Sequence, residues 1–128
     1  MKYWTIKTFV TDSGRNVIKE WVKDQPKGAQ AEINTRLRFL ETQETWGRPY
    51  SAKLKVYDHI HEIRIKWERN QYRPLGFVGP RVGEFILLIG AVEKDSKFEP
   101  KNAPSTAEER RKLVLKDEKY AVKYFDDL

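Results

Sequence analysis

The sequence contains no cysteine, which excludes disulfide bonds and metal sites built from thiolates. Long hydrophobic runs are also absent, because the longest apolar segment, residues 85–92, is far too short to span a bilayer. The first residues lack the apolar stretch of a secretory signal peptide. No glycine-rich phosphate loop, nucleophile elbow or nucleotide-binding fingerprint occurs. We therefore expect a cytoplasmic protein that needs no membrane, no metal and no small-molecule cofactor.

Histidine is scarce as well. The two histidines, His59 and His61, are spaced i, i+2, which places both on one side of a strand. A metal site needs further ligands at close range, and the sequence offers no third one. His61 stays open as a general base, although its side of the strand is shared with the apolar Ile63.

Charge is abundant in place of these groups. Charged residues make up 34% of the 128 residues, and the formal net charge is +6. A basic surface of this kind suits nucleic acid, an acidic protein partner or an anionic membrane. The length predicts one domain, which we place at residues 1–118 and follow with a C-terminal tail at 119–128.

Hydrophobic patterning predicts a strand and a helical hairpin in the first half of the chain. Polar and apolar residues alternate over residues 3–9, as expected of a strand. Two apolar stripes at helical spacing follow: Val17, Ile18, Trp21 and Val22, then Ala29, Ile33, Leu37 and Leu40. Residues 11–13 offer N-caps for the first helix, and Pro26 suits the first turn of the second. The short break between them predicts antiparallel packing.

Three strands are expected next, over residues 59–67, 72–78 and 85–92, with residues 53–57 as a short extra strand or a lead-in. In the first of them, alternate residues form an apolar face and a charged face, and the charged face carries Glu62, Arg64 and Lys66. The third is apolar on both faces, which predicts a central strand that is covered on both sides.

A last helix and the overall class complete the predicted fold. A capping box over residues 105–108 begins this helix, which extends to about Lys116. The order strand, two helices, three strands and helix indicates an α+β domain. We expect a mostly antiparallel sheet of about four strands, with the helical hairpin on one face and a C-terminal helix.

Arg64 and Arg73 lie in the middle of neighbouring predicted strands. A guanidinium is always charged and donates hydrogen bonds in a planar fork that suits phosphate. Arg64 faces away from the apolar side of its strand, whereas Arg73 shares its face with Leu75 and Phe77 and is expected to be partly buried. If both reach one spot, they form an anion site suited to RNA. This hypothesis requires that they face the same side and are not both held in internal carboxylate pairs.

The order and spacing of these motifs resemble the RelE/ParE toxin superfamily, and within it the phage-derived HigB-like branch of type II toxin–antitoxin systems. The resemblance covers about residues 3–116 and rests on Lys53-Leu54, Glu62-Ile63-Arg64, Tyr72-Arg73, Leu87-Leu88-Ile89-Gly90, Lys94, Lys97 and Pro100. It implies a RelE-like fold and a toxin that acts as a ribosome-dependent mRNA endonuclease without a cofactor. The implied partners are the ribosome, mRNA and a cognate antitoxin protein.

The resemblance also implies roles for particular residues. Arg64 and Arg73 would hold the scissile phosphate, and Lys94 would assist as a charge or a proton donor. Further RNA contacts are expected from four basic residues around them: Lys53, Lys55, Lys66 and Arg69. Solvated surface is the ordinary alternative for these four.

Three features depart from the family pattern. Glu93 stands where the first lysine of a pair is expected, Pro74 follows Arg73, and the turn at residues 79–81 is longer. These features keep two other hypotheses open. One is a catalytically inactive phage-derived protein of the same fold that binds a protein or RNA, and the other is a toxin that inhibits DNA gyrase.

Overall fold

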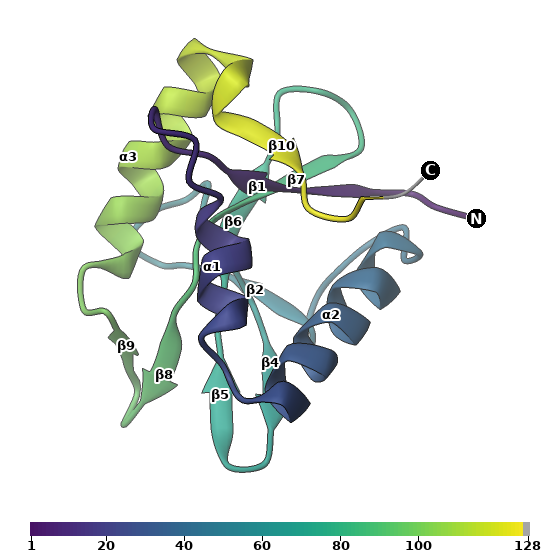
Figure 1. Cartoon of the computed structure of the whole chain (residues 1–128), viewed down its shortest axis with the longest axis vertical. Coiled ribbons are helices and arrows are strands. Elements are labelled where there is room, and N and C mark those ends of the chain that lie inside the picture. The colour runs from purple at the N-terminus through teal and green to yellow at the C-terminus, as the bar shows by residue number, and fades with distance from the viewer. Residues whose placement is uncertain (127–128) are drawn as a thin grey trace.

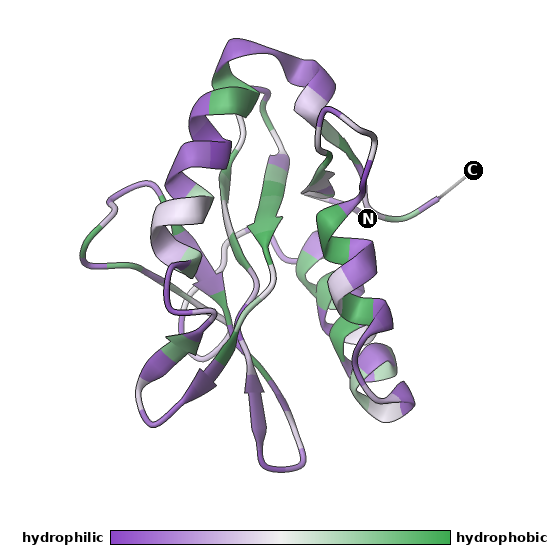
Figure 2. Cartoon of the chain, turned by 60° about the vertical axis from the view of Figure 1, so that its left-hand side comes forward, coloured by the Kyte–Doolittle hydropathy of each residue, from purple (hydrophilic) through white to green (hydrophobic). Residues whose placement is uncertain are grey.

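The computed structural model describes residues 1–126 and has three layers. Helices α1 (Val17–Lys23) and α2 (Lys27–Glu41) lie on one side of the strands, and helix α3 (Ala103–Lys116) lies on the other (Figure 1 and Figure 2). The helical hairpin, the C-terminal helix and the α+β class agree with the sequence-based expectation. No helix in this part of the chain is long and apolar enough to cross a bilayer.

The strands form two sheets rather than one sheet of about four strands. The larger sheet has the order β10-β1-β7-β6-β3-β2 and contains β1 (Thr5–Phe9), β2 (Ser51–Lys53), β3 (His61–Ile63), β6 (Leu75–Val78), β7 (Glu84–Ile89) and β10 (Ala121–Lys123). The smaller has the order β4-β5-β8-β9 and contains β4 (Ile65–Trp67), β5 (Asn70–Tyr72), β8 (Val92–Lys94) and β9 (Lys97–Glu99). Only β1 and β7 pair in parallel among these strands, so the sheets are mostly antiparallel, as predicted.

The difference in strand count arises because each of the three long predicted strands breaks and changes sheet. The breaks fall at Arg64, at residues 73–74 and at residues 90–91. Hydrogen bonds continue across them: the Ile63 amide donates to the Pro74 carbonyl at 2.9 Å, and the Arg73 amide donates to the Ala91 carbonyl at 2.8 Å. The three breaks are therefore neighbours, and they form one crease between the two sheets. Both mid-strand arginines lie at this crease.

Strand β7 separates two hydrophobic cores, and this confirms the predicted central strand. Phe85 and Leu87 pack in the core beneath α1 and α2. Ile86 and Leu88 pack in the core beneath α3. All four side chains are at most 2% exposed. The alternation of a strand thus supplies apolar side chains to both layers of helices.

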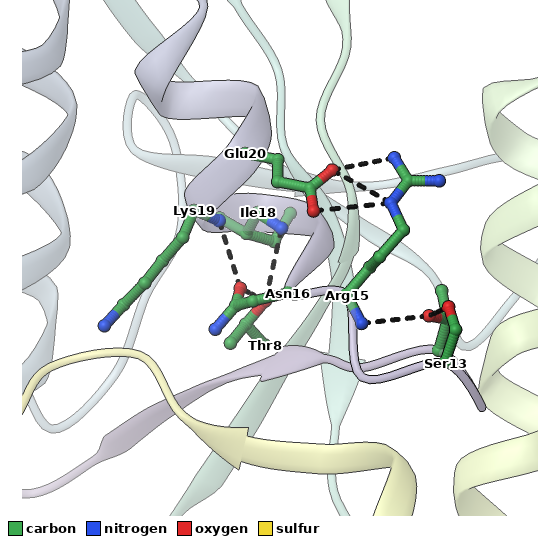
Figure 3. A network of polar contacts seen from close by, with 8 residues as sticks. Thr8, Ser13, Arg15, Asn16, Ile18, Lys19 and Glu20 are labelled. Carbon is green, nitrogen blue, oxygen red and sulfur yellow. Dashed lines mark hydrogen bonds and ion pairs between the residues drawn. The ribbon is translucent and has the colours of Figure 1, made fainter.

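Helix α1 begins later than the residues proposed as its caps. Its N-cap is Asn16, whose side-chain oxygen accepts a hydrogen bond from the Lys19 amide at 3.1 Å (Figure 3). Thr8 of β1 supports the cap, because its hydroxyl donates to Asn16 at 2.8 Å and accepts from the Ile18 amide at 3.3 Å. The predicted caps at residues 11–13 instead belong to the turn that precedes the helix.

The C-terminal segment is more ordered than the expected tail. Helix α3 ends at Lys116 as predicted, but it begins at Ala103, before the proposed capping box. A 3-10 turn, η1 (Glu118–Tyr120), then leads into β10, which pairs antiparallel with β1. Tyr124 is 5% exposed and donates a hydrogen bond to the Asn34 side chain at 2.5 Å. The end of the proposed tail, residues 127–128, lies outside the described residues.

Candidate anion-binding site

A cavity of about 360 Å³ opens beside the crease where β3 gives way to β4. One wall comes from α2 and from the loop that leads to β2. The other comes from the breaks at Arg64 and at residues 73–74 and from the β4–β5 hairpin. The lining residues are Arg36, Pro49, Tyr50, Arg64, Lys66, Gln71 and Arg73. Four of these side chains carry positive charge, so the cavity attracts anions.

Arg64 is the first of the predicted site residues in this cavity. Its amide donates to the Tyr50 carbonyl at 2.8 Å, which fixes the backbone at the break. Its guanidinium Nε lies 3.1 Å from Glu62 Oε2, and the side chain is 28% exposed. Arg64 thus has one carboxylate partner and remains open to solvent, which leaves most of its donors available to a ligand.

Arg73 also lines the cavity, but its side chain is only 5% exposed. Its Nε donates to Glu93 Oε1 at 3.0 Å, and its two terminal nitrogens donate to the Tyr72 carbonyl at 3.1 Å and the Gln71 side-chain oxygen at 2.7 Å. The predicted partial burial is therefore more complete than the strand pattern indicated. Every nitrogen of this guanidinium already has a partner within the protein.

Glu62 connects the two arginines. Its Oε2 lies 3.1 Å from Arg64 Nε and 3.8 Å from Arg73 Nε. Burial raises the pKa of Glu62 above its ordinary value, while the positive charges of Arg64 and Arg73 act in the opposite direction. The two guanidiniums thus reach one place, but both are paired with carboxylates. The first requirement of the sequence-based hypothesis is met, because both arginines line one cavity. The second is not met, because each arginine is held by a carboxylate of the protein, although Arg64 keeps 28% of its side chain exposed.

Lys66 is the one further predicted RNA contact that lines the cavity. It lies opposite Gln71 in the β4–β5 pair, so both side chains project from the same face of the smaller sheet. No ion-pair partner of Lys66 occurs within residues 1–126. Lys53, Lys55 and Arg69 are exposed but lie outside the cavity lining, at the end of β2, in the loop after it and in the β4–β5 turn.

Lys94 does not line the cavity. Its neighbour Glu93 reaches Arg73, and successive side chains of a strand point to opposite faces. Lys94 therefore projects from the other face of β8, where its Nζ lies 3.5 Å from Glu99 Oε2 and its side chain is 60% exposed. The break at residues 90–91 was not foreseen, and it determines which of these two residues meets the site.

Arg36 of α2 belongs to the cavity and was missed by the sequence analysis. Its guanidinium carbon lies 5.0 Å from the centre of the Tyr50 ring and 5.6 Å from that of Phe39. Within residues 1–126, the carboxylate of Glu32 lies 4.0 Å from its guanidinium, and its buried Nε has no hydrogen-bond partner. A positive residue beside the apolar stripe of a helix was the available signal, but helical periodicity alone does not identify what that residue faces.

The histidines lie away from this cavity. Burial lowers the pKa of His61, and its ring packs against Phe85 with the ring centres 6.2 Å apart. The described residues contain no group of three His, Asp or Glu side chains placed to hold a metal ion. Nothing in the geometry therefore assigns His61 to the cavity.

A larger cavity of about 600 Å³ lies between α1, α2 and the C-terminal segment. Two of its three basic side chains, those of Lys19 and Arg38, are engaged by the chain itself. Lys19 Nζ lies 3.1 Å from Asp126 Oδ2, and the Arg38 guanidinium lies 3.9 Å from the centre of the Phe125 ring. The smaller cavity at the crease is therefore the better candidate for an anion site.

Comparison with protein families agrees with a phage-related origin. A family model described as "Phage derived protein Gp49-like (DUF891)" matches residues 20–112. The matched segment includes every residue that lines the crease cavity. Searches of curated proteins and of solved structures found no match. Because the family match spans well over half of the sequence, the chain belongs to the Gp49-like family of phage-derived, toxin-like proteins.

Proposed function

We propose that this protein is a RelE-like toxin of a type II toxin–antitoxin system that enters the ribosome and cleaves mRNA. The family membership supports a toxin, and the crease cavity supports a phosphate-containing substrate. The observation that carries the proposal is the placement of Arg64 beside Lys66 and Arg73 in one cavity. The partners in this proposal are the ribosome, mRNA and an antitoxin that blocks the cavity.

The proposed chemistry is cleavage of RNA without a metal ion. The ribose 2′-oxygen bonds to phosphorus while the bond from phosphorus to the 5′-oxygen of the next nucleotide breaks, which yields a 2′,3′-cyclic phosphate. The 2′-hydroxyl gives up its proton, and the leaving 5′-oxygen takes one up. Negative charge grows on the phosphate oxygens during this exchange, and preorganised positive groups lower the barrier. Arg64 supplies this charge directly because it is accessible. Arg73 is buried, so it adds positive potential to the cavity without touching the phosphate, and its hydrogen bonds stabilise the crease.

Induced expression tests this function. We expect growth arrest, with mRNA cut within translated codons as mapped by primer extension. Arg64→Ala should abolish the cleavage, whereas Arg81→Ala should retain it, because Arg81 lies away from the cavity and pairs with Glu118 at 2.7 Å. Intact mRNA in arrested cells, together with a DNA-damage response, would instead indicate the gyrase-directed alternative.

The structure favours one second candidate, a protein that keeps the fold and binds RNA or a protein without cleaving. The specific observation is the pairing of Arg64 with Glu62 and of Arg73 with Glu93, at 3.1 Å and 3.0 Å. These carboxylates compete with a substrate phosphate for the guanidiniums. Binding of single-stranded RNA without growth arrest would support this candidate over the nuclease.

A further inference from the structure

We propose that Arg36 is a phosphate-binding residue of the crease cavity and that Arg36, Arg64 and Lys66 contact the ligand, whereas Arg73 is a positioning residue. The inference rests on the proposed function in taking an RNA phosphodiester as the ligand. It assigns the phosphate contact to a residue of α2, outside the strands on which the sequence motifs lie.

Arg36 keeps hydrogen-bond donors that no group within residues 1–126 uses. A guanidinium carries five N–H donors. Arg36 has one carboxylate at 4.0 Å, the outer limit of an ion pair, and its Nε is buried without a partner within residues 1–126. The side chain is 30% exposed and lines the cavity. A phosphate oxygen in the cavity would offer these donors the acceptor that the protein does not provide.

Aromatic contacts preorganise the Arg36 side chain. The Arg36 guanidinium stacks on Tyr50, and the Tyr50 ring in turn packs against Phe39, with centres 5.3 Å apart. The Tyr50 carbonyl also accepts the Arg64 amide at 2.8 Å. Tyr50 therefore ties both arginines to one short segment. A side chain held in this way loses little conformational entropy when it binds a ligand.

The arginines of the cavity differ in how many of their donors the protein already uses. All three nitrogens of Arg73 donate to groups of the protein, and the side chain is 5% exposed. A ligand would have to break these bonds to reach it. Arg36, Arg64 and Lys66 have no such set of partners in the described chain. A phosphodiester thus meets three accessible cations that come from the helix and from the crease.

The experiment measures binding of a single-stranded RNA oligonucleotide by fluorescence anisotropy at several salt concentrations. Arg36→Gln should weaken binding about ten-fold, as expected for one lost charged hydrogen bond. It should also reduce the log–log salt slope by about 0.7, the value for one phosphate contact with a single strand. Arg81→Gln is the control, because it removes one positive charge away from the cavity. Arg36→Lys should fall between wild type and Arg36→Gln, since it keeps the charge and loses the planar fork.

A second readout does not depend on a stable variant. In the wild-type protein, the Nε–H resonance of Arg36 should shift on titration with the same RNA in heteronuclear NMR, and that of Arg81 should not. An unshifted Arg36 signal, or an Arg36→Gln variant that binds like Arg81→Gln, would overturn the inference and leave the proposed function standing. RNA binding that depends on Arg36 without cleavage would uphold it and reject the nuclease. A wild-type protein that binds no RNA would reject both.

Discussion

At the scale of single residues, the departures from the toxin pattern acquire a physical meaning. Glu93 replaces an expected lysine, and the structure shows it as the ion-pair partner of the buried Arg73 at 3.0 Å. A buried guanidinium without a carboxylate would be strongly unfavourable. Glu93 therefore neutralises the buried charge of Arg73. This pairing explains why position 93 carries a carboxylate where the family pattern has a lysine.

Glu62→Gln tests how the shared carboxylate affects the site. The variant removes the negative charge that Arg64 and Arg73 share, so we expect inorganic phosphate to bind several-fold more tightly. Arg64 stays solvated and Arg73 keeps Glu93, so the fold should persist. Isothermal titration calorimetry with phosphate measures the effect. Unchanged affinity in a folded variant would show that the cavity does not use these guanidiniums.

The same variant carries a prediction about pH. Burial places the folded-state pKa of Glu62 above its unfolded value, so ionisation disfavours the folded state. The contribution of Glu62 to the free energy of unfolding is fully present below its pKa in the unfolded state. This contribution is lost as the pH rises through its pKa in the folded state. The melting temperature of the wild type should therefore fall relative to Glu62→Gln as the pH rises from the ordinary carboxylate range, near 4.5. An opposite trend would show that pairing with the arginines outweighs burial.

At the scale of elements, two close contacts between glycine and tryptophan bring the helices against the sheets. A Cβ atom at Gly90 would lie 2.0 Å from Trp21 Cδ2, and one at Gly28 would lie 2.3 Å from Trp67 Cζ2. Gly90 lies at the crease, so the Trp21 ring of α1 packs directly against the backbone that follows the end of β7. These contacts require a residue without a side chain.

Gly90→Ala tests this packing. The added methyl group cannot fit beside the Trp21 ring, and overpacking of this kind costs about 1–3 kcal/mol. Urea unfolding followed by tryptophan fluorescence measures the loss. Gly47→Ala is the matched control, since a Cβ at Gly47 would have no atom of residues 1–126 within 4 Å apart from its two chain neighbours. Equal stability of both variants would mean that Trp21 moves aside freely.

Tyr124→Phe tests how firmly the C-terminal segment is attached to α2. The variant loses the hydrogen bond to Asn34, which should cost about 1 kcal/mol near neutral pH. Burial raises the pKa of Tyr124 to about 12 from its ordinary 10.0, so the wild type should lose stability as the pH rises between these values. Phenylalanine cannot ionise, and the variant should lack this alkaline loss. Denaturant unfolding of both proteins at a series of alkaline pH values measures the effect. If the free energies of unfolding of wild type and variant changed in parallel with pH, Tyr124 would not be buried in the folded state.

At the scale of the whole molecule, a net charge of +6 supports electrostatic association with RNA in general. Under the proposed function, the crease cavity is the specific location at which RNA binds. Lys66→Ala should reduce the log–log salt slope of single-strand binding by about 0.7, because one phosphate contact is lost. Lys101→Ala, at an exposed turn outside the cavity, should change the slope less. Identical salt slopes for both variants would show that Lys66 contributes only to the general positive charge and makes no specific phosphate contact.

The sequence predicted the helices and the two-sided strand β7 because their apolar spacing follows directly from local geometry. It did not predict the crease, because side chains alternate with the same period in a strand that continues and in one that changes sheet. It missed β10 for a related reason, since Ala121–Lys123 pairs with β1 at the opposite end of the chain. The local sequence of a three-residue segment carries no signal of pairing with a strand so distant along the chain.

By itself, the sequence determined the α+β class, the apolar faces of the helices and the supply of basic side chains for an anion site. Only the tertiary structure decided which of those side chains a ligand can reach. Arg73 is saturated by neighbours that include Glu93, twenty positions away, whereas Arg36 meets the cavity from a helix. Hydrogen-bond partners and exposure depend on residues brought together by folding, and the order of residues along the chain does not reveal them.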